Sequence, residues 1–342
     1  MYLFRNDYSE GTHPQVLAAL SATNLEGNIG YGFDPYTQRA AALIKKLCKA
    51  PKADVQFTIG GTQANFLAIC TFLRPWESVI CPETGHINGH EAGAVEATGH
   101  KLLQAKTAPD GKLTPEHITP IVAACADEHV TLPGLVYISN ATETGGVYTK
   151  AELAALSKCC RQNNLLLFLD GARLGAAFGS EENDLTLPDL AKYCDAFYLG
   201  GTKNGALMGE ALVIVKPELQ QGFFRMKKQR GAVLAKGWLL GAQFEALLKD
   251  GLYWELGRHS TAMAQKLQAG LTAMGVPMLS PSPSNQIFPV VADAVLPALR
   301  EICAFEVWGR TDEAHTAIRF VCSFATREAD VDAFLTELRA LL

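Results

Sequence analysis

The stretch Leu165-Leu-Leu-Phe-Leu-Asp170-Gly-Ala-Arg173 is an apolar run that ends on a carboxylate, and a second run, Ala196-Phe-Tyr-Leu-Gly-Gly-Thr-Lys203, leads to an amine. Apolar runs of this length between helical patterns are typical of buried parallel strands. In open α/β sheets, ligands bind outside the carboxyl ends of such strands. We therefore expect Asp170 and Lys203 to face the same crevice.

A buried carboxylate and a lysine at one crevice are what an enzyme needs to hold pyridoxal phosphate (PLP). The lysine would form a Schiff base with the cofactor aldehyde, and the carboxylate would keep the pyridine nitrogen protonated so that the ring accepts electrons. The pair also has a purely structural interpretation, in which Asp170 caps the following helix and Lys203 is a solvated loop residue.

The composition is that of an ordinary globular protein, with 342 residues of which 48% are hydrophobic and 19% charged. A single hydrophobic core stops growing at about 250 to 300 residues, so this length favours one large domain with a smaller companion. The net charge of −5 and the absence of a long Lys/Arg run argue against nucleic acid or an anionic membrane as the main partner.

The sequence also bears on location. Residues 1–7 lack a basic segment followed by an apolar stretch, so no secretory signal or transit peptide is apparent, and no apolar run is long enough to span a bilayer. The nine cysteines are odd in number, follow no framework spacing and include no Cys-x-x-Cys motif. These features favour a reducing cytoplasm.

Strand-like and helix-like stretches alternate from about residue 50 to 215, which is the pattern of a doubly wound sheet. The expected strands are 79–81, 135–139, 165–169, 196–199 and 211–215, and the clearest helices are 114–125 and 149–163. A helical pattern over 239–248 and 252–274 leads into an apolar stretch at 286–291, strands near 305–307 and 317–324, and helices at 295–303 and 328–342. We predict an α/β fold with a large, mainly parallel domain over residues 1–250 and a smaller α+β domain over 251–342.

The segment Thr58-Ile-Gly-Gly-Thr-Gln-Ala-Asn65 opens an apolar helical run. Glycines let backbone N–H groups approach an anion, and the positive end of a helix completes a phosphate seat. An ordinary glycine turn with Thr62 as the N-cap is the alternative.

Four of these features occur in a familiar order: Gly-Gly-Thr-Gln-Ala-Asn at 60–65, His86 in Glu-Thr-Gly-His, Asp-Gly-Ala-Arg at 170–173, and Thr-Lys-Asn at 202–204. The chain thereby resembles the PLP-dependent enzymes of fold type I, the aspartate-aminotransferase-like fold. It is most similar to their L-threonine aldolase and β-eliminating lyase branch, from Arg5-Asn-Asp7 and Tyr31-Gly-Phe-Asp-Pro35 to the strand around Arg319.

The resemblance implies a set of cofactor contacts. Lys203 would be the Schiff-base lysine, Asp170 would hold the pyridine nitrogen and His86 would stack on the ring face. The phosphate would bind to Gly60, Gly61 and Thr62.

The resemblance also implies contacts with the substrate. Arg173 would lie beside both cofactor and substrate, and Asn6 would belong to the substrate site. Arg319 matches the family position that binds the substrate carboxylate through a planar two-pronged contact. The alternatives are a structural ion pair for Arg173 and an exposed strand position for Arg319.

His86, His90 and Glu91 invite a metal interpretation because histidines four residues apart share a helix face. No third ligand stands at a recognisable spacing, and His-Glu-x-x-His is absent, so we predict no metal. The resemblance instead assigns Glu91 to the support of His86 or of the active-site hydrogen bonds.

The basic run Lys227-Lys-Gln-Arg230 is typical of a solvated helix entrance. In the resembling family, a basic residue of this region crosses the dimer interface to the phosphate of the neighbouring subunit, and Tyr31 comes from near the same interface. Lys228 and Arg230 are both candidates for that role. The resemblance thus implies a homodimer, or a dimer of dimers, with shared active sites.

The chain departs from the family pattern at one place. L-threonine aldolases typically show Asn-Thr-His after the central strand, whereas this sequence reads Asn140-Ala-Thr142-Glu-Thr-Gly-Gly. Thr142 therefore stands where the family has a histidine associated with the β-hydroxyl of the substrate. With that histidine absent, we expect His86 or an ordered water near Glu91 to take the hydroxyl proton.

The resemblance predicts a cytoplasmic PLP-dependent aldolase that cleaves β-hydroxy-α-amino acids of the L-threonine or L-allo-threonine type to glycine and an aldehyde. Other PLP chemistry on the same fold, such as β-elimination or transamination, is the alternative. A protein that binds a phosphate ligand without covalent chemistry is a second alternative, although the chain has neither a G-x-G-x-x-G after a strand nor a Walker sequence.

Overall fold

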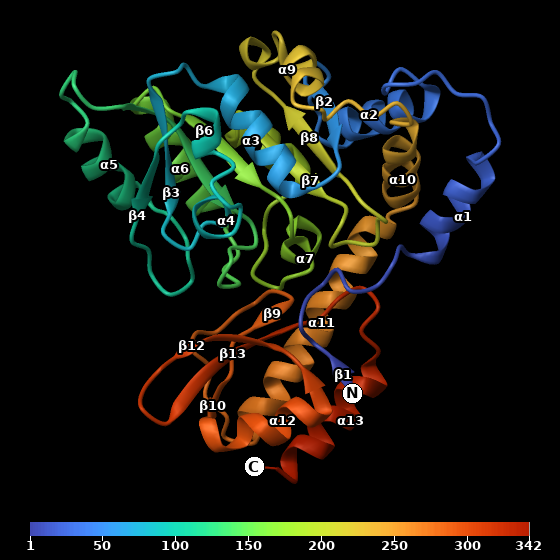
Figure 1. Ribbon diagram of the computed structural model, residues 1–342, viewed down its shortest axis with the longest axis vertical. Helices are drawn as coiled ribbons and strands as arrows, with labels where there is room; N and C mark the ends of the chain where they lie inside the picture. The colour runs from blue at the N-terminus through green and yellow to red at the C-terminus, as the bar shows by residue number, and fades with distance from the viewer. Residues whose placement is uncertain (342) are drawn as a thin grey trace.

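The computed structural model describes residues 1–341, and its largest feature is a seven-stranded sheet with helices on both faces (Figure 1). The strand order is β2-β8-β7-β6-β5-β3-β4. The strands are β2 (Asp54–Thr58), β3 (Glu77–Pro82), β4 (Leu102–Ala105), β5 (Leu132–Ser139), β6 (Leu166–Asp170), β7 (Ala196–Gly200) and β8 (Glu210–Ile214). Strand β8 runs antiparallel to both of its neighbours, and the other neighbouring pairs are parallel. The predicted α/β fold with a mainly parallel sheet is confirmed.

The sequence prediction found five of these strands and missed β2 and β4. Strands β5 to β8 are buried along nearly their whole length, so they read as continuous apolar runs. In β2, the half-buried Asp54 and Gln56 interrupt the apolar pattern. Strand β4 has four residues at the edge of the sheet. Edge strands carry the weaker hydrophobic signal because only part of their surface is covered.

Helices cover both faces of this sheet, and alternate residues of each strand face opposite ways. Val136 and Ile138 of β5 join one hydrophobic cluster, while Leu135 and Tyr137 join another. The first cluster includes residues of α1 (Pro14–Thr23), α2 (Pro35–Leu47), α5 (Pro115–Ala124), α6 (Lys150–Gln162), α8 (Leu187–Tyr193) and α10 (Trp238–Lys249). The second includes residues of α3 (Gly61–Phe72), α4 (His86–Gly89) and α9 (Phe223–Gln229). We call residues 14–250 the sheet body.

Helix ends follow the sequence signals. Helix α6 starts with a capping box: Thr149 Oγ1 accepts a hydrogen bond from Glu152 N, and Glu152 Oε2 accepts one from Thr149 N. The helical pattern after residue 238 is divided in two at Gly251, whose φ of +82° suits glycine best. Helix α11 (Leu252–Ala273) starts directly after it.

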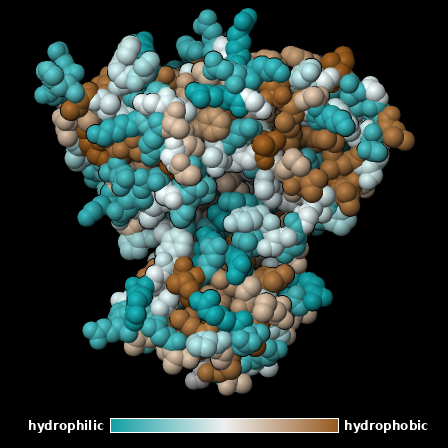
Figure 2. All heavy atoms as spheres, viewed as in Figure 1, coloured by the Kyte–Doolittle hydropathy of each residue, from teal (hydrophilic) through white to brown (hydrophobic). Residues whose placement is uncertain are grey.

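The C-terminal body comprises residues 274–341 together with β1 (Tyr2–Leu3), which pairs in parallel with β11. It contains a small antiparallel sheet, in which β13 lies between β10 and β12 and also pairs with β9. Its elements are β9 (Gln286–Ile287), β10 (Val290–Ala292), α12 (Leu296–Ile302), β11 (Cys303–Ala304), β12 (Glu306–Arg310), β13 (His315–Val321) and α13 (Glu328–Arg339). The molecule narrows between the two bodies (Figure 2).

Helix α11 belongs to both bodies. Leu252 and Leu256 pack in the core of the sheet body, whereas Met263 and Leu267 pack in the core of the C-terminal body. The helix lies close to α7 (Leu174–Phe178): a Cβ on Gly257 would stand 2.0 Å from the carbonyl oxygen of Gly175. We propose that the division between the two predicted domains falls near residue 250, as the sequence suggests, with β1 added to the smaller one.

None of the helices in the described part of the chain has both the length and the apolar character needed to cross a membrane.

Candidate active site

A cavity of about 450 Å³ lies between the two bodies, at the carboxyl ends of β5 and β6. Residues from β12 and β13 of the C-terminal body close its other side. The cavity brings together eight of the residues singled out in the sequence: Gly60, Gly61, Thr62, His86, Asp170, Arg173, Lys203 and Arg319. Asp170 and Lys203 therefore share one crevice, as the two apolar runs predict.

Asp170 ends β6 and is buried among hydrogen-bond donors. Its Oδ2 accepts from Tyr137 Oη at 2.6 Å and from Asn65 Nδ2 at 3.0 Å, while its Oδ1 accepts from the backbone N–H of Ala172 at 2.9 Å. Burial by itself would raise the pKa of this carboxyl, but the bonds from Tyr137 and from the Ala172 amide hold the pKa below its ordinary value. The cavity thus contains a fixed anion.

His86 and Asp170 are linked through a chain of buried polar groups. His86 Nδ1 lies 2.8 Å from Glu91 Oε1, and the Glu91 side chain is fully shielded from solvent. Asn65 Nδ2 donates to Glu91 Oε1 at 2.8 Å as well as to Asp170. Asn65 comes from α3, one turn after the glycines, so the same helix presents its N-terminus to the cavity and holds two carboxylates together. Glu91 lies behind His86 and does not line the cavity itself.

Lys203 stands in the loop after β7, with its Nζ 5.7 Å from the ring centroid of Tyr8. Burial, and next the positive charge of Arg173, lower the pKa of the Lys203 amine from its ordinary value. A lysine with a lowered pKa keeps a larger neutral fraction, and only the neutral amine is nucleophilic. The structure therefore provides an amine suited to attack a carbonyl.

The glycines at 60 and 61 form the start of α3. Gly60 is the N-cap of this helix and makes no side-chain capping bond, so the alternative of Thr62 as the N-cap is wrong. A Cβ on Gly61 would lie 2.9 Å from Tyr198 Oη. That hydroxyl is buried and has no hydrogen-bond partner within residues 1–341. The uncapped backbone N–H groups at the start of this helix form a site for an anion.

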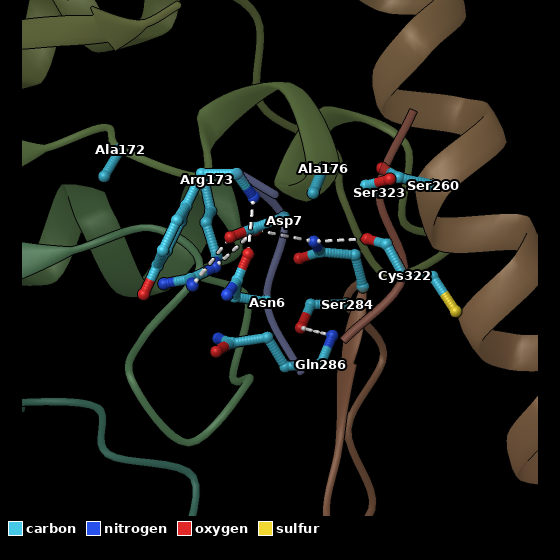
Figure 3. A network of polar contacts seen from close by, with 12 residues as sticks. Asn6, Asp7, Ala172, Arg173, Ala176, Ser260, Ser284, Gln286, Cys322 and Ser323 are labelled. Atoms are coloured by element: carbon cyan, nitrogen blue, oxygen red, sulfur yellow. Dashed lines mark hydrogen bonds and ion pairs between the residues drawn. The ribbon is translucent and has the colours of Figure 1, made fainter. Parts of the chain in front are cut away.

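Arg173 is held by a carboxylate from the start of the chain. Its Nε and Nη2 donate to Asp7 Oδ2 and Oδ1 at 2.8 and 3.0 Å, and Asn285 Nδ2 donates to Asp7 Oδ2 at 2.9 Å (Figure 3). Asn285 also donates to the carbonyl oxygen of Cys322. Asp7 is completely buried; burial would raise the pKa of its carboxyl, but Arg173 and then Lys203 bring that pKa below its ordinary value. The sheet body, the chain segment around Asp7 and the C-terminal body thus meet at one ion pair.

Arg319 reaches the cavity from β13 of the C-terminal body. Its side chain is 12% exposed, so it is not a solvated strand residue. Its Nη2 donates to Glu306 and its Nη1 to Gln286 Oε1 at 3.2 Å, while Cζ lies 5.7 Å from the ring centroid of Trp308. Its Nε is buried without a partner in the described chain. This guanidinium therefore retains a donor for a ligand.

Five other residues singled out in the sequence lie away from this cavity: Asn6, Tyr31, Thr142, Lys228 and Arg230. The side chain of Asn6 accepts from Tyr8 N and Ser9 Oγ within its own loop. Thr142 Oγ1 donates to Asp110 O at 2.6 Å and accepts from Gly146 N at 2.8 Å, which turns it into the loop after β5. Lys228 Nζ lies 5.0 Å from the ring centroid of Tyr31, and Arg230 is exposed.

Several residues that line the cavity were missed by the sequence reasoning: Tyr8, Ser139, Glu143, Tyr198, Glu210, Glu306 and Trp308. Glu143 follows Thr142 directly, so the strand-end rule that identified Asp170 applies to it equally. Glu210 is buried at the start of β8, where burial raises the pKa of its carboxyl to about 8. The local sequence around Glu306 and Trp308 does not indicate a role in the site, because both residues lie on β12, a strand that is distant in the sequence from the other lining residues.

The histidines His86 and His90 have their ring centroids 5.6 Å apart. Among residues 1–341, no group of three or more His, Cys, Asp or Glu side chains is arranged to hold a metal ion.

Known proteins resemble this chain over nearly its full length. The sequence model of the β-eliminating lyase family matches residues 4–294. A low specificity L-threonine aldolase of Pseudomonas sp. is 34% identical, with 99% of this chain and 97% of that protein covered. The enzyme of the same name from Saccharomyces cerevisiae is 28% identical, with 83% of this chain and 73% of that protein covered.

Solved structures of known proteins also superimpose on nearly the whole chain. A threonine aldolase of Leishmania major superimposes with a TM-score of 0.98 at 46% identity, covering 100% of this chain and 99% of the other. An aspartate aminotransferase of Thermus thermophilus superimposes with a TM-score of 0.74 at 17% identity, covering 100% and 92%. The second match concerns the fold alone, which is that of the fold type I PLP enzymes.

Proposed function

Since the chain belongs to the β-eliminating lyase family, we propose that it is a PLP-dependent aldolase. It would cleave the Cα–Cβ bond of β-hydroxy-α-amino acids, of the L-threonine or L-allo-threonine type, to glycine and an aldehyde. The observation that carries this proposal is the joint placement of Lys203, Asp170, His86 and Arg319 around one cavity. The names of the Pseudomonas and Leishmania relatives support the choice of substrate.

The residues of the cavity fit PLP. The uncapped start of α3 suits its phosphate, and Lys203 would hold its aldehyde. Asp170, which stays ionised because of its donors, would hold the pyridine nitrogen, and His86 would cover one ring face. When bound, PLP supplies an aldehyde that joins covalently to amines and a ring that accepts the electron pair of a bond broken at Cα.

The remaining residues orient the substrate. Arg173 donates to Asp7 through Nε and Nη2, which leaves Nη1 for a ligand, and Arg319 retains Nε. Two guanidinium groups on opposite bodies would then bind the substrate carboxylate from two sides. Binding at one end of the amino acid fixes which bond at Cα lies in the reactive position.

We further propose a homodimer, or a dimer of dimers, that shares its active sites. Large apolar side chains are exposed on the segment between α1 and α2, among them Leu25 (97% exposed), Ile29 (67%) and Phe33 (55%), and Figure 2 shows hydrophobic surface on the side where α1 and α10 lie. Patches of this kind mark protein–protein contacts. Tyr31 with Lys228 or Arg230 would reach the phosphate of the neighbouring subunit from this surface.

A cytoplasmic location is consistent with the cysteines, which are all free thiols in the structure and mostly buried.

One substrate panel tests the function and its nearest alternative. Purified holoprotein is incubated with L-threonine, L-allo-threonine and phenylserine, and glycine plus aldehyde is measured against keto acid. The family match leaves β-elimination as the second candidate, and keto acid as the main product would exclude the aldolase in favour of β-elimination or transamination. Visible absorbance that survives dialysis and disappears in Lys203→Ala would separate an enzyme from a protein that merely binds a phosphate ligand.

A further inference from the structure

Glu143 lines the cavity and has one carboxylate oxygen without a hydrogen-bond partner in the described chain. Its Oε1 accepts hydrogen bonds from Ser139 Oγ at 2.7 Å and from the backbone N–H of His86 at 2.9 Å. These two donors come from different elements, β5 and α4, and fix the carboxyl group. Its Oε2 is buried and has no partner in residues 1–341, although Glu143 lines the cavity.

The other carboxylates at this site are already engaged. Asp170 accepts three hydrogen bonds. Glu91 is sealed behind His86, and Glu306 accepts from Arg319. Glu210 accepts from the backbone N–H of Gly201, on the side of the Lys203 loop.

Glu143 stands directly after Thr142, the residue that occupies the family's histidine position. The hydroxyl of Thr142 is engaged with Asp110 and Gly146 within the loop, so this side chain does not reach a ligand. The next residue along the chain does line the cavity. The loop after β5 therefore still places a group that can carry a proton at the cavity. That group is the carboxyl of Glu143, one position after the site where the family has a histidine.

The surroundings of Glu143 suit a base. Burial, together with the negative charge of Asp170, raises the pKa of the Glu143 carboxyl, while the bond from Ser139 opposes the rise. The charged and titratable groups around it are Cys81 on β3, His86 on α4, Tyr137 on β5, Tyr148 after the same loop, Asp170 on β6 and Arg173 before α7. A carboxyl with a raised pKa is a stronger base than an exposed one.

We propose that Glu143 accepts the proton of the substrate β-hydroxyl, an assignment that rests on the proposed aldolase function. The O–H bond breaks and its proton passes to Glu143 Oε2, while its electron pair forms the second bond of the aldehyde carbonyl. The Cα–Cβ bond breaks, and its electron pair remains with Cα until a proton joins that carbon and gives glycine. Glu143 then returns its proton to water and regains its charge.

The test separates the hydroxyl step from the chemistry at Cα. Cleavage of L-threonine and phenylserine is measured beside exchange of the glycine α-hydrogen in D₂O, because glycine has no β-hydroxyl. In Glu143→Gln, which keeps an acceptor for Ser139 and His86, we expect kcat for cleavage to fall by about 10²–10⁴-fold while glycine exchange changes by less than about 3-fold. Glu143→Asp should recover part of the cleavage rate. Glu83→Gln removes an exposed carboxylate three residues before His86 and should leave both rates unchanged.

A second variant moves the base without removing it. Ser139→Ala deletes one donor to Oε1, so the rising limb of kcat against pH should shift to higher pH. Equal losses of cleavage and glycine exchange in Glu143→Gln would make Glu143 a support of His86 and overturn the proposal. Cleavage within about 3-fold of wild type would overturn it too. If the wild-type protein exchanges glycine but cleaves no β-hydroxy amino acid, the aldolase function itself is wrong.

Discussion

The ion pair between Asp7 and Arg173 predicts a large loss of stability in Asp7→Asn. Asp7 is 0% exposed and accepts three hydrogen bonds, two of them from the guanidinium, whose side chain is itself 10% exposed. Removal of one partner of a buried pair leaves an uncompensated charge, at a cost of about 3–5 kcal/mol. At about 2 °C per kcal/mol for a chain of this size, Tm should fall by about 6–10 °C.

The measurement is thermal and urea unfolding of the holoprotein, followed by circular dichroism. The pKa of Asp7 is lower in the folded protein than its ordinary value of 3.8. The stabilisation is therefore fully present above that value and is lost as the pH falls through the folded pKa. The difference between wild type and Asp7→Asn should be complete at neutral pH and should shrink in acid.

A double-mutant cycle makes the prediction refutable. Arg173→Met leaves Asp7 as the unpaired charge, whereas the double variant removes both charges, so its loss should be much smaller than the sum of the two single losses. Glu10→Gln, an exposed change in the same segment, should stay within about 0.5 kcal/mol of wild type. Strict additivity in the cycle, or a loss below about 1 kcal/mol in Asp7→Asn, would show that this contact does not hold the bodies together.

Three other variants test separate parts of the structure. Asn65→Ala removes the donor shared by Glu91 and Asp170, so we expect the free energy of unfolding in urea to fall by about 1–3 kcal/mol. The pH at which the bound cofactor changes its visible spectrum should rise in the same variant. Lys227 is 8% exposed, and burial lowers its pKa from 10.5 to about 8, so the wild-type protein should gain stability as the pH rises from 8 to 10.5. Lys227→Met should stabilise the protein at pH 7 and abolish that gain. An unchanged pH dependence in the variant would refute this. Gly61→Ala should weaken PLP binding by about 10-fold in a titration, because its Cβ would meet Tyr198 Oη at 2.9 Å, and Tyr198→Phe in the same protein should restore part of the affinity.

The sequence was informative wherever a local pattern decides the structure. Buried strands such as β6 are continuous apolar runs, and a polar residue at the carboxyl end of a parallel strand must face the edge where ligands collect. Asp170 and Lys203 were therefore predictable, as were the capping box at Thr149 and Glu152. The interrupted pattern of β2 and the short edge strand β4 were not.

Contacts between distant residues were beyond the reach of sequence reasoning. Asp7 and Arg173 are 166 residues apart in the sequence, and no spacing rule connects the two positions. The loop after β5 illustrates a different limit. Whether Thr142 or Glu143 faces the cavity depends on the turn closed by the hydrogen bonds Thr142 N to Gly146 O and Gly145 N to Thr142 O, which a single sequence does not reveal.

The close approach of α11 to α7 at Gly257 fixes the distance between the two bodies that form the ligand site. Helix α11 is one continuous piece of 22 residues, so a displacement at Gly257 is carried to the strands that bear Arg319. A methyl group there would force the two helices apart, and a misplacement of about 1 Å costs a reaction roughly 10²-fold. A position that touches no ligand thus sets the separation of Arg173 and Arg319, the two guanidinium groups that would bind the substrate carboxylate, so substrate preference can change through it without a change in the residues that line the pocket.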